Sequence, residues 1–199
     1  MDNYPITKSA ASILLTDYGE FTIEIYVDRE GREHVVLSRG QFSALEPVLV
    51  RVHSECITGE VFHSRHCDCK NQLDKALQMI GAASAGAVIY LRQEGRDIGL
   101  SNKIKAYDLQ RQGLDTVVAN EQLGFLPDAR TYEVAAAILE SLGIRTVRLM
   151  TNNPDKVEQL SALGITVAER VPLAVPPNGV DDAYLEAKRI KLGHWLETI

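Results

Sequence analysis

The chain has 199 residues, of which 45% are hydrophobic, 24% charged and 6% aromatic, and its formal net charge is −6. An acidic chain of this kind is a poor candidate for wrapping nucleic acid, although it can carry a local basic pocket for one anionic small molecule. Its three cysteines are an odd number that argues against a secreted disulfide framework. Its apolar runs are too short to span a membrane, and its first residues lack a signal-peptide core. We therefore expect a soluble, cytoplasmic protein.

The first fifty-odd residues have a β-rich pattern. Runs of β-branched residues and of alternating apolar and polar residues predict strands, and glycine and aspartate residues separate these runs. The predicted strands cover residues 11–16, 21–27, 33–38 and 47–53.

From about residue 70 the pattern changes to alternating helix and strand. Leu73, Ala76, Leu77 and Ile80 keep a helical spacing and predict a helix that ends near 81–86. Further helices are predicted over about 98–112, over 128–142 and from about 181, with strands over 87–91, 144–150 and 164–168.

One further helix is predicted from its capping residues. Asn153 suits the N-cap and Pro154 the first helical position, since proline there loses no hydrogen bond. The whole pattern predicts a mixed α/β protein, with a β-rich part over about 1–55 and an α/β part over about 56–199. We expect 1–199 to form a single catalytic domain.

The three cysteines lie close together in the sequence. Cys56, Cys67 and Cys69 have the spacing C-x10-C-x-C, and thiolates at this density favour a soft metal, most commonly Zn²⁺. The chain has no fourth cysteine, so the fourth ligand is either a water, as in catalytic zinc sites, or a histidine, as in closed structural sites.

Three histidines are close enough in sequence to supply that fourth ligand: His53, His63 and His66. Spacing alone does not separate a catalytic from a structural zinc, and three buried cysteines without metal are a third alternative.

Three segments have the composition of an anion-binding pocket. Residues 51–55 and 92–100 contain arginines at the ends of predicted strands, where ligands commonly bind in α/β sheets. Residues 151–156 would offer the free N–H groups of a helix N-terminus to an anion. Together with a metal site, these segments predict a phosphorylated substrate that is hydrolysed. Neither a P-loop nor a GxGxxG motif occurs.

Asp128 and Arg130 form a short polar pair at the start of the helix predicted over 128–142. An aspartate two residues from an arginine could activate it. On physical grounds alone we favour a structural role, with Asp128 as an N-terminal helix charge and Arg130 as a surface residue.

The ordered motifs resemble the bacterial GTP cyclohydrolase II family. The resemblance covers nearly the whole chain and rests on the motifs RVHSEC, CDC, YLRQEGRDIGL, NKI, LMTNNPDK and KLGH. It implies a GTP cyclohydrolase II-like α/β fold. The implied activity opens the imidazole ring of GTP and releases formate and pyrophosphate, which is the first step toward riboflavin.

The resemblance also implies a role for each matching residue. Cys56, Cys67 and Cys69 would hold one catalytic Zn²⁺ per chain, and Mg²⁺ would accompany the substrate phosphates. Asp128 would be the proton acceptor, Arg130 the nucleophile toward the α-phosphate, and Tyr107 would assist ring opening. The residues implied to contact GTP are Arg51, Val52, His53, Ser54, Glu55, Gln72, Glu94, Gly95, Arg96, Thr116, Thr151 and Lys156.

The sequence departs from the family pattern at His63, His66 and Lys70. Lys70 stands where many members have glycine, so it would be strained if the backbone there had a positive φ. These departures leave open a specialised paralogue that acts on GTP or a related purine nucleotide. A second alternative, which would have a closed Cys₃His site, is a non-catalytic zinc-stabilised nucleotide-binding module. A homodimer is expected on family grounds.

Overall fold

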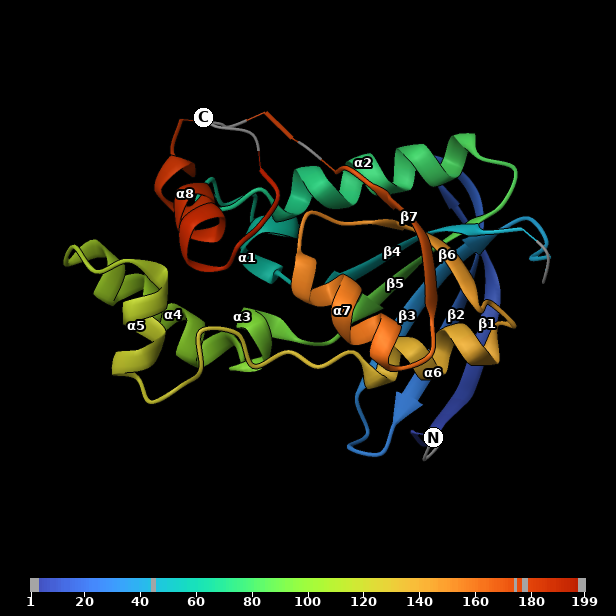
Figure 1. Cartoon of the computed structure of the whole chain (residues 1–199), viewed down its shortest axis with the longest axis horizontal. Coiled ribbons are helices and arrows are strands. Elements are labelled where there is room, and N and C mark those ends of the chain that lie inside the picture. The colour runs from blue at the N-terminus through green and yellow to red at the C-terminus, as the bar shows by residue number, and fades with distance from the viewer. Residues whose placement is uncertain (1–3, 44–45, 174, 177–178, 197–199) are drawn as a thin grey trace.

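The computed structural model describes residues 4–43, 46–173, 175–176 and 179–196, and a seven-stranded sheet runs through it (Figure 1). The sheet order is β1-β2-β3-β5-β4-β6-β7. The strands are β1 (Ile6–Thr16), β2 (Gly19–Asp28), β3 (Glu33–Arg39), β4 (Val48–Ser54), β5 (Gly86–Leu91), β6 (Thr146–Met150) and β7 (Thr166–Val171). The helices are α1 (Ile57–Glu60), α2 (Cys69–Ala82), α3 (Glu94–Asp97), α4 (Leu100–Arg111), α5 (Thr116–Gln122), α6 (Glu133–Ser141), α7 (Pro154–Ala162) and α8 (Asp182–Lys191).

The sheet has an antiparallel half and a parallel half. Neighbours pair antiparallel from β1 through β2 and β3 to β5, and parallel among β5, β4, β6 and β7. In the parallel half all carboxyl ends point to the same edge. Three of the strands that end there are β4, β5 and β6, and the three predicted anion-binding segments lie at or just beyond these ends.

Helices cover both faces of the parallel half. Val48, Val50 and Val52 of β4 pack into one core cluster with α6, while Leu49 points the other way into a second cluster with α2. This alternation is the two-residue period of a strand buried on both faces. The result is a three-layer arrangement with α2 on one side and α6 and α7 on the other (Figure 1).

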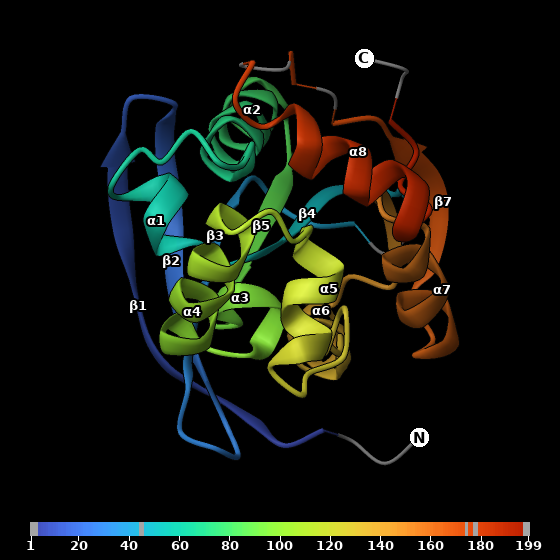
Figure 2. The same ribbon diagram turned by 90° about the vertical axis from the view of Figure 1, so that its left-hand side faces the viewer.

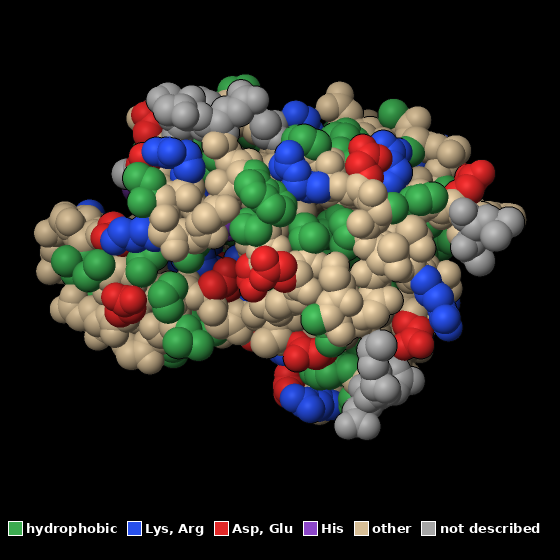
Figure 3. All heavy atoms as spheres, in the orientation of Figure 1, with side chains coloured by type: hydrophobic (Ala, Val, Ile, Leu, Met, Phe, Trp, Pro, Cys, Tyr) green, Lys and Arg blue, Asp and Glu red, His purple; other side chains and the backbone are tan. Residues whose placement is uncertain are grey.

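The remaining helices lie beyond the carboxyl edge of the parallel strands. Figure 2 looks onto this end and shows α3, α4 and α5 grouped together, with α8 beside α2. On the face shown in Figure 3, acidic and basic side chains are mixed. No helix among the described residues is long and apolar enough to cross a membrane.

Strand β1 forms an unusually exposed edge of the sheet. Nine consecutive residues between Ile6 and Thr16 are exposed, so side chains on both faces of the strand reach solvent. They include Ile13 and Leu15, which are 57% and 77% exposed. An edge strand of this length with apolar residues is a ready surface for pairing with another chain.

The structure confirms the mixed α/β class and every predicted strand, although β1 begins five residues earlier than expected. Asn153 caps α7 as predicted, since its side chain accepts from the N–H of Asp155. The strain considered at Lys70 does not arise, because this residue lies in the first turn of α2. His63, in contrast, has a φ of 56°.

One helix boundary was predicted wrongly. Helix α6 begins at Glu133 rather than near residue 128. Asp128 is therefore not a helix charge; its carboxylate accepts from the backbone N–H of Arg130 and from the guanidinium of the same residue. These local bonds compete with helix formation. Helices α1, α3 and α5 were not predicted.

Candidate active site

The candidate site lies at the carboxyl edge of the sheet, between β4 and β6. The connection after β4 runs through α2 on one face, whereas the connection after β6 runs through α7 on the other. Adjacent parallel strands whose connections leave on opposite faces create a crevice, and ligands of open α/β sheets bind in such crevices. The cavity found at this edge is lined by residues of all three predicted segments.

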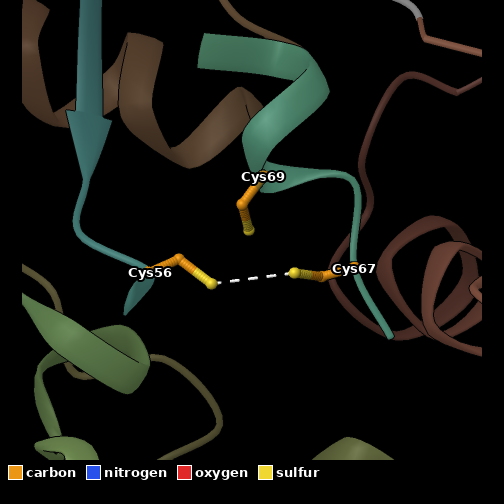
Figure 4. A group of neighbouring side chains, drawn as sticks. All are labelled: Cys56, Cys67 and Cys69. Carbon is orange, nitrogen blue, oxygen red and sulfur yellow. Dashed lines mark hydrogen bonds between the residues drawn. The ribbon is translucent and has the colours of Figure 1, made fainter. Parts of the chain in front are cut away.

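Three cysteine side chains converge at one side of this cavity. Cys56 follows β4, Cys67 lies in the loop before α2, and Cys69 is the first residue of α2 (Figure 4). Their Sγ atoms all lie within 4.8 Å of one another, and those of Cys56 and Cys67 are 3.6 Å apart. A tetrahedral zinc with bonds of about 2.3 Å separates its thiolates by about 3.8 Å. The donor set and spacing therefore fit a tetrahedral thiophilic metal.

Gly59 in α1 provides the space for this cluster. A Cβ atom at this position would lie 2.9 Å from the Sγ of Cys67 and 3.3 Å from the Sγ of Cys56. Any larger residue would push into the thiols. The chain thus approaches the cluster closely where only glycine fits.

No histidine joins the thiol group among the residues that the structure describes. The ring of His53 instead contacts Glu60 at 2.8 Å through Nε2, and its Nδ1 accepts from Arg51. His66 packs its ring against that of Tyr107. The geometry therefore supplies three protein ligands and does not reproduce the closed Cys₃His alternative.

Lys103 of α4 links the thiol cluster to a carboxylate. Its ammonium donates to the Sγ of Cys56 at 3.1 Å and to Oε1 of Glu94 at 2.8 Å. Hydrogen bonds from the Cys67 and Cys69 thiols, together with the Lys103 charge, lower the pKa of Cys56. One thiolate is thus stabilised within the cluster before any metal binds.

Glu94 is engaged on both carboxylate oxygens. Oε1 also accepts from the N–H of Gly95, and Oε2 accepts from the N–H of Ile57 at 2.7 Å. Glu94 therefore ties α3 to the start of α1, next to Cys56. The residues that follow it, Gly95, Arg96 and Asp97, all have positive φ. Such a conformation is costly at non-glycine residues and commonly occurs at functional sites.

Two buried cations on the other side of the cavity have no carboxylate partner among the described residues. Arg51 donates to the carbonyl of Met150 at 2.9 Å and to Gln72 at 2.6 Å, and Lys156 donates to the carbonyl of Val52 at 2.6 Å. Both are almost completely buried. Burying an unpaired charge is expensive, so this arrangement is suited to an anionic ligand.

Burial lowers the pKa values of these two cations. The pKa of Arg51 falls to about 10, and that of Lys156 falls well below its ordinary value, with the positive charges of Arg51 and Arg130 adding to the effect on Lys156. A bound polyanion would reverse this penalty, because it favours the charged forms.

Arg130 and Asp128 form an ion pair beside these cations. The Nε of Arg130 donates to Asp128 at 2.8 Å, and a second bond from Nη2 makes the pair bidentate. Burial opposes the charge on both groups. The effects of Tyr132 and Asp128 on Arg130 are together larger than the effect of burial, so the pKa of Arg130 is raised. Arg130 in turn lowers the pKa of Asp128 despite the burial of that carboxylate. The structural role first favoured for Arg130, a surface residue, is wrong because its side chain is only 15% exposed and lines the cavity.

Comparison with known proteins identifies the family. The sequence model of the family "GTP cyclohydrolase II" matches residues 7–172. The chain belongs to the GTP cyclohydrolase II family. The GTP cyclohydrolase-2 of Pseudomonas putida (strain W619) is 52% identical over 96% of this chain and 94% of its own length. The GTP cyclohydrolase-2 of Shewanella baltica is 52% identical over 94% of this chain and 92% of its own length.

Other relatives are longer. The riboflavin biosynthesis protein RibBA of Chlorobium phaeovibrioides is 50% identical over 96% of this chain, but the chain spans about half (47%) of its length. Among solved structures, RibBX, a two-domain 3,4-dihydroxy-2-butanone 4-phosphate synthase from A. baumannii, matches with a TM-score of 0.48 and 20% identity. That match covers 83% of this chain and 40% of the other.

The fold brings nearly all residues implied by the GTP cyclohydrolase II resemblance to one cavity. Val52 and Asp128 do not line it, but they bond to Lys156 and Arg130, which do. The implied residues that line it are Arg51, His53, Ser54, Glu55, Cys56, Cys67, Cys69, Gln72, Glu94, Gly95, Arg96, Tyr107, Thr116, Arg130, Thr151 and Lys156.

Several cavity residues were not predicted. Lys103 lies in the NKI motif, which the resemblance included, but a lysine in a helix carries no local signal for contact with a thiol. Tyr184, Lys188 and His194 come from α8 and the segment after it. The KLGH motif, which includes His194, pointed to this region. The sequence does not show that these residues reach the cavity, because that depends on how the C-terminal helix folds back.

Proposed function

We propose that this chain is a zinc-dependent GTP cyclohydrolase II. It opens the imidazole ring of GTP and releases formate and pyrophosphate, leaving a diaminopyrimidinone ribosyl phosphate for riboflavin synthesis. The observation that carries the proposal is the cavity itself, which joins a three-thiol cluster to two buried cations that have no carboxylate partner among the described residues. The sheet runs through both parts of the chain, which supports one catalytic domain.

Zinc fits the three thiols better than magnesium or calcium, which prefer oxygen ligands. Cys56, Cys67 and Cys69 would hold it, and when bound it would supply an activated water for hydrolysis at C8 of the guanine. The hydroxyl of Tyr107 lies 3.3 Å from Oγ1 of Thr58, close to the thiols. This position supports the prediction that Tyr107 assists ring opening.

The cations would bind the triphosphate. Arg51 and Lys156 are fixed by carbonyl groups of β6 and β4, so their positive charges are held in place before the substrate arrives. Preorganised charge of this kind stabilises the charge that develops at the α-phosphorus. Mg²⁺ would be held mainly by the phosphates, since it usually takes few protein ligands.

Arg130 is proposed as the nucleophile toward the α-phosphorus and Asp128 as its base. Attack by a guanidine requires the loss of one proton, and the raised pKa of Arg130 opposes this loss. The bidentate contact supports Asp128 as the group that takes the proton. The same contact fixes the orientation of Arg130 toward the cavity.

A homodimer and a cytoplasmic location complete the proposal. The exposed, apolar β1 edge supports pairing with a second copy of the chain. The clustered free thiols support a reducing compartment.

The test is to incubate the zinc-loaded protein with GTP and Mg²⁺ and to measure formate, pyrophosphate and the mass of the remaining nucleotide. We expect formate and pyrophosphate in equal amounts. Pyrophosphate without formate would contradict ring opening. A specialised paralogue that acts on a related purine nucleotide would release formate from that nucleotide and not from GTP, which the same assay detects by exchanging the substrate.

A further inference from the structure

The C-terminal segment contributes to the cavity although it lies beyond the residues that the family model matches. That match ends at residue 172. Tyr184, Lys188, Leu192 and His194 nevertheless line the same cavity as the thiols and the arginines. Figures 1 and 2 show α8 at the carboxyl edge of the sheet, beside the beginning of α2.

Helix α8 is anchored on the loop that carries two of the cysteines. The ammonium of Lys188 donates to Oδ1 of Asp68 at 2.9 Å, and Asp68 stands between Cys67 and Cys69. The two side chains are only 11% and 5% exposed. A buried ion pair tolerates little displacement of either partner, so it fixes where α8 sits relative to the thiols.

The segment after α8 is anchored at a second place. The N–H of His194 donates to the carbonyl of Lys188 at 3.0 Å, and the N–H of Trp195 donates to the carbonyl of Asn152 at 2.9 Å. Asn152 follows β6 and belongs to the same anion-binding segment, 151–156, as Lys156. These two bonds hold His194 between the helix and the anion-binding side of the cavity.

His194 lies among positive charges. Burial and the cations Lys188, Arg130, Arg96 and Lys156 together lower the pKa of His194 to about 3. Its neutral ring makes no hydrogen bond within the part of the chain that the structure describes, yet it lines the cavity. A neutral imidazole surrounded by cations has an N–H free to donate to an anion that the cations attract.

We propose that His194 contacts the phosphate groups of the substrate and that Lys188 positions it by fixing α8 on Asp68. The substrate-binding site then extends beyond residue 172, where the match to the family model ends, into the C-terminal helix and the residues after it. This inference rests on the proposed function, because it takes the substrate to be a nucleoside triphosphate. The ring of Tyr184 also contacts Lys188, since the ammonium lies 4.3 Å from the ring centroid.

The test compares His194→Ala with the wild type and with Ile190→Ala, an exposed position on the same helix. Binding of inorganic triphosphate and of guanosine is measured separately by calorimetry, together with zinc content. We expect His194→Ala to weaken triphosphate binding about tenfold, as the loss of one bond to a charged group does, while guanosine binding and zinc content stay unchanged. Ile190→Ala should match the wild type in all three.

A second variant tests the positioning role. The double variant Lys188→Met and Asp68→Asn removes the charges of both partners, so that neither is left as an unpaired buried ion. We expect the KM for GTP to rise about tenfold with a smaller change in kcat, whereas a purely structural role would lower both activity and thermal stability without that split.

The outcomes separate the two proposals. If the wild type bound triphosphate and released formate but His194→Ala bound triphosphate equally well, this inference would be wrong and the proposed function would stand. If the wild type bound triphosphate as expected but released no formate, the proposed function would be wrong while the C-terminal anion site stood. If the wild type did not bind triphosphate, this inference would be wrong, and formate release from GTP would decide the proposed function separately.

Discussion

At the scale of single residues, the thiol cluster depends on neighbours that bind no metal. Gly59 leaves room for the sulfur atoms, and Lys103 donates to one of them. Both contact the thiol ligands and not the metal itself, and such contacts change how strongly the ligands bind a metal. Their effects can be measured as metal affinity, independently of any catalysed reaction.

The first prediction concerns Gly59. A Cβ at 2.9 Å from the Sγ of Cys67 must displace the thiol, so Gly59→Ala should lower zinc affinity by about tenfold or more. The measurement is a competition titration with a chromophoric chelator. Gly31→Ala is the control, because a Cβ there meets no atom within 4 Å, although Gly31, unlike Gly59, has a positive φ of 78°. This control should lose some stability and keep its zinc affinity.

The second prediction concerns Lys103. Lys103→Gln removes the positive charge next to Cys56 and Glu94, so zinc affinity should fall about tenfold through weaker stabilisation of the thiolate. Cobalt substitution gives a second measure, since the thiolate-to-cobalt absorption should shift. Lys105→Gln, two residues along on the exposed side of α4, is the matched control. Equal affinity in the two variants would show that the Lys103 contact is without consequence.

The cysteines could be predicted from the sequence because their spacing is itself the signal. Gly59 and Lys103 could not, since one acts by lacking a side chain and the other reaches Cys56 from 47 residues away. The two buried cations could be predicted only in part as well. Arg51 and Lys156 were predicted as phosphate-binding residues, but only the structure shows that they are buried, with no carboxylate partner in the part of the chain that it describes.

At the scale of elements, the segment Gly95–Arg96–Asp97 is the most strained part of the site. All three residues have positive φ, and Asp97, at 71°, is held by Arg32 at 3.1 Å. The segment ties α3 to the region before α6, since Arg96 donates to the carbonyl of Pro127 and accepts from the N–H of Ala129. These contacts therefore hold the strained backbone and keep Arg96 at the cavity.

The third prediction isolates this strain. Asp97→Gly and Asp97→Ala both lose the contact with Arg32, but only alanine keeps the cost of a positive φ, about 1 kcal/mol. Asp97→Gly should therefore be the more stable variant by about that amount in urea unfolding. The interpretation fails if the alanine variant is equally stable or more stable.

Periodicity predicted the elements that pack against the core and failed for those that do not. Strands β2 to β7 and helix α2 show apolar runs, two-residue spacing or helical spacing, because their apolar residues pack into the buried clusters. Residues 128–132 are irregular despite a helical composition, since Asp128 bonds to Arg130 instead of to a helix. The short helices α1 and α3 have too few residues to show a period.

At the scale of the whole molecule, the sheet order decides the site. Segments distant in the sequence meet because β5, β4 and β6 are parallel neighbours, and the opposite connections on either side of β4 open a crevice between them. From the sequence we could predict that polar residues lie at the ends of several strands. The sequence could not show that β6 lies beside β4, because that pairing depends on contacts between residues about a hundred positions apart.

The fourth prediction concerns pH. His34 and His53 are buried and neutral: each Nε2–H faces a carboxylate, and each Nδ1 accepts from an N–H donor. Burial lowers the pKa of both below 6.5, so as pH falls below about 6.5 the unfolded chain takes up protons that the folded chain does not. The free energy of unfolding of the apoprotein should therefore decrease between pH 7.5 and 5.5, by up to about 1.4 kcal/mol per histidine and pH unit.

Urea unfolding at the two pH values measures this slope. His63→Asn is the control, because His63 is exposed and asparagine tolerates its positive φ. The control should keep the wild-type slope. A wild-type stability that is independent of pH in this range would contradict the assignment of neutral, buried histidines.

Ring opening at the thiol cluster is tested by determining zinc content and formate release together for Cys67→Ser and the wild type, with GTP and Mg²⁺. We predict that the wild type binds one zinc per chain and releases formate, and that Cys67→Ser loses both, because removal of one of three thiolates leaves too few protein ligands. A variant that lost its zinc and still released formate at the wild-type rate would contradict the central claim that ring opening takes place at the thiol cluster.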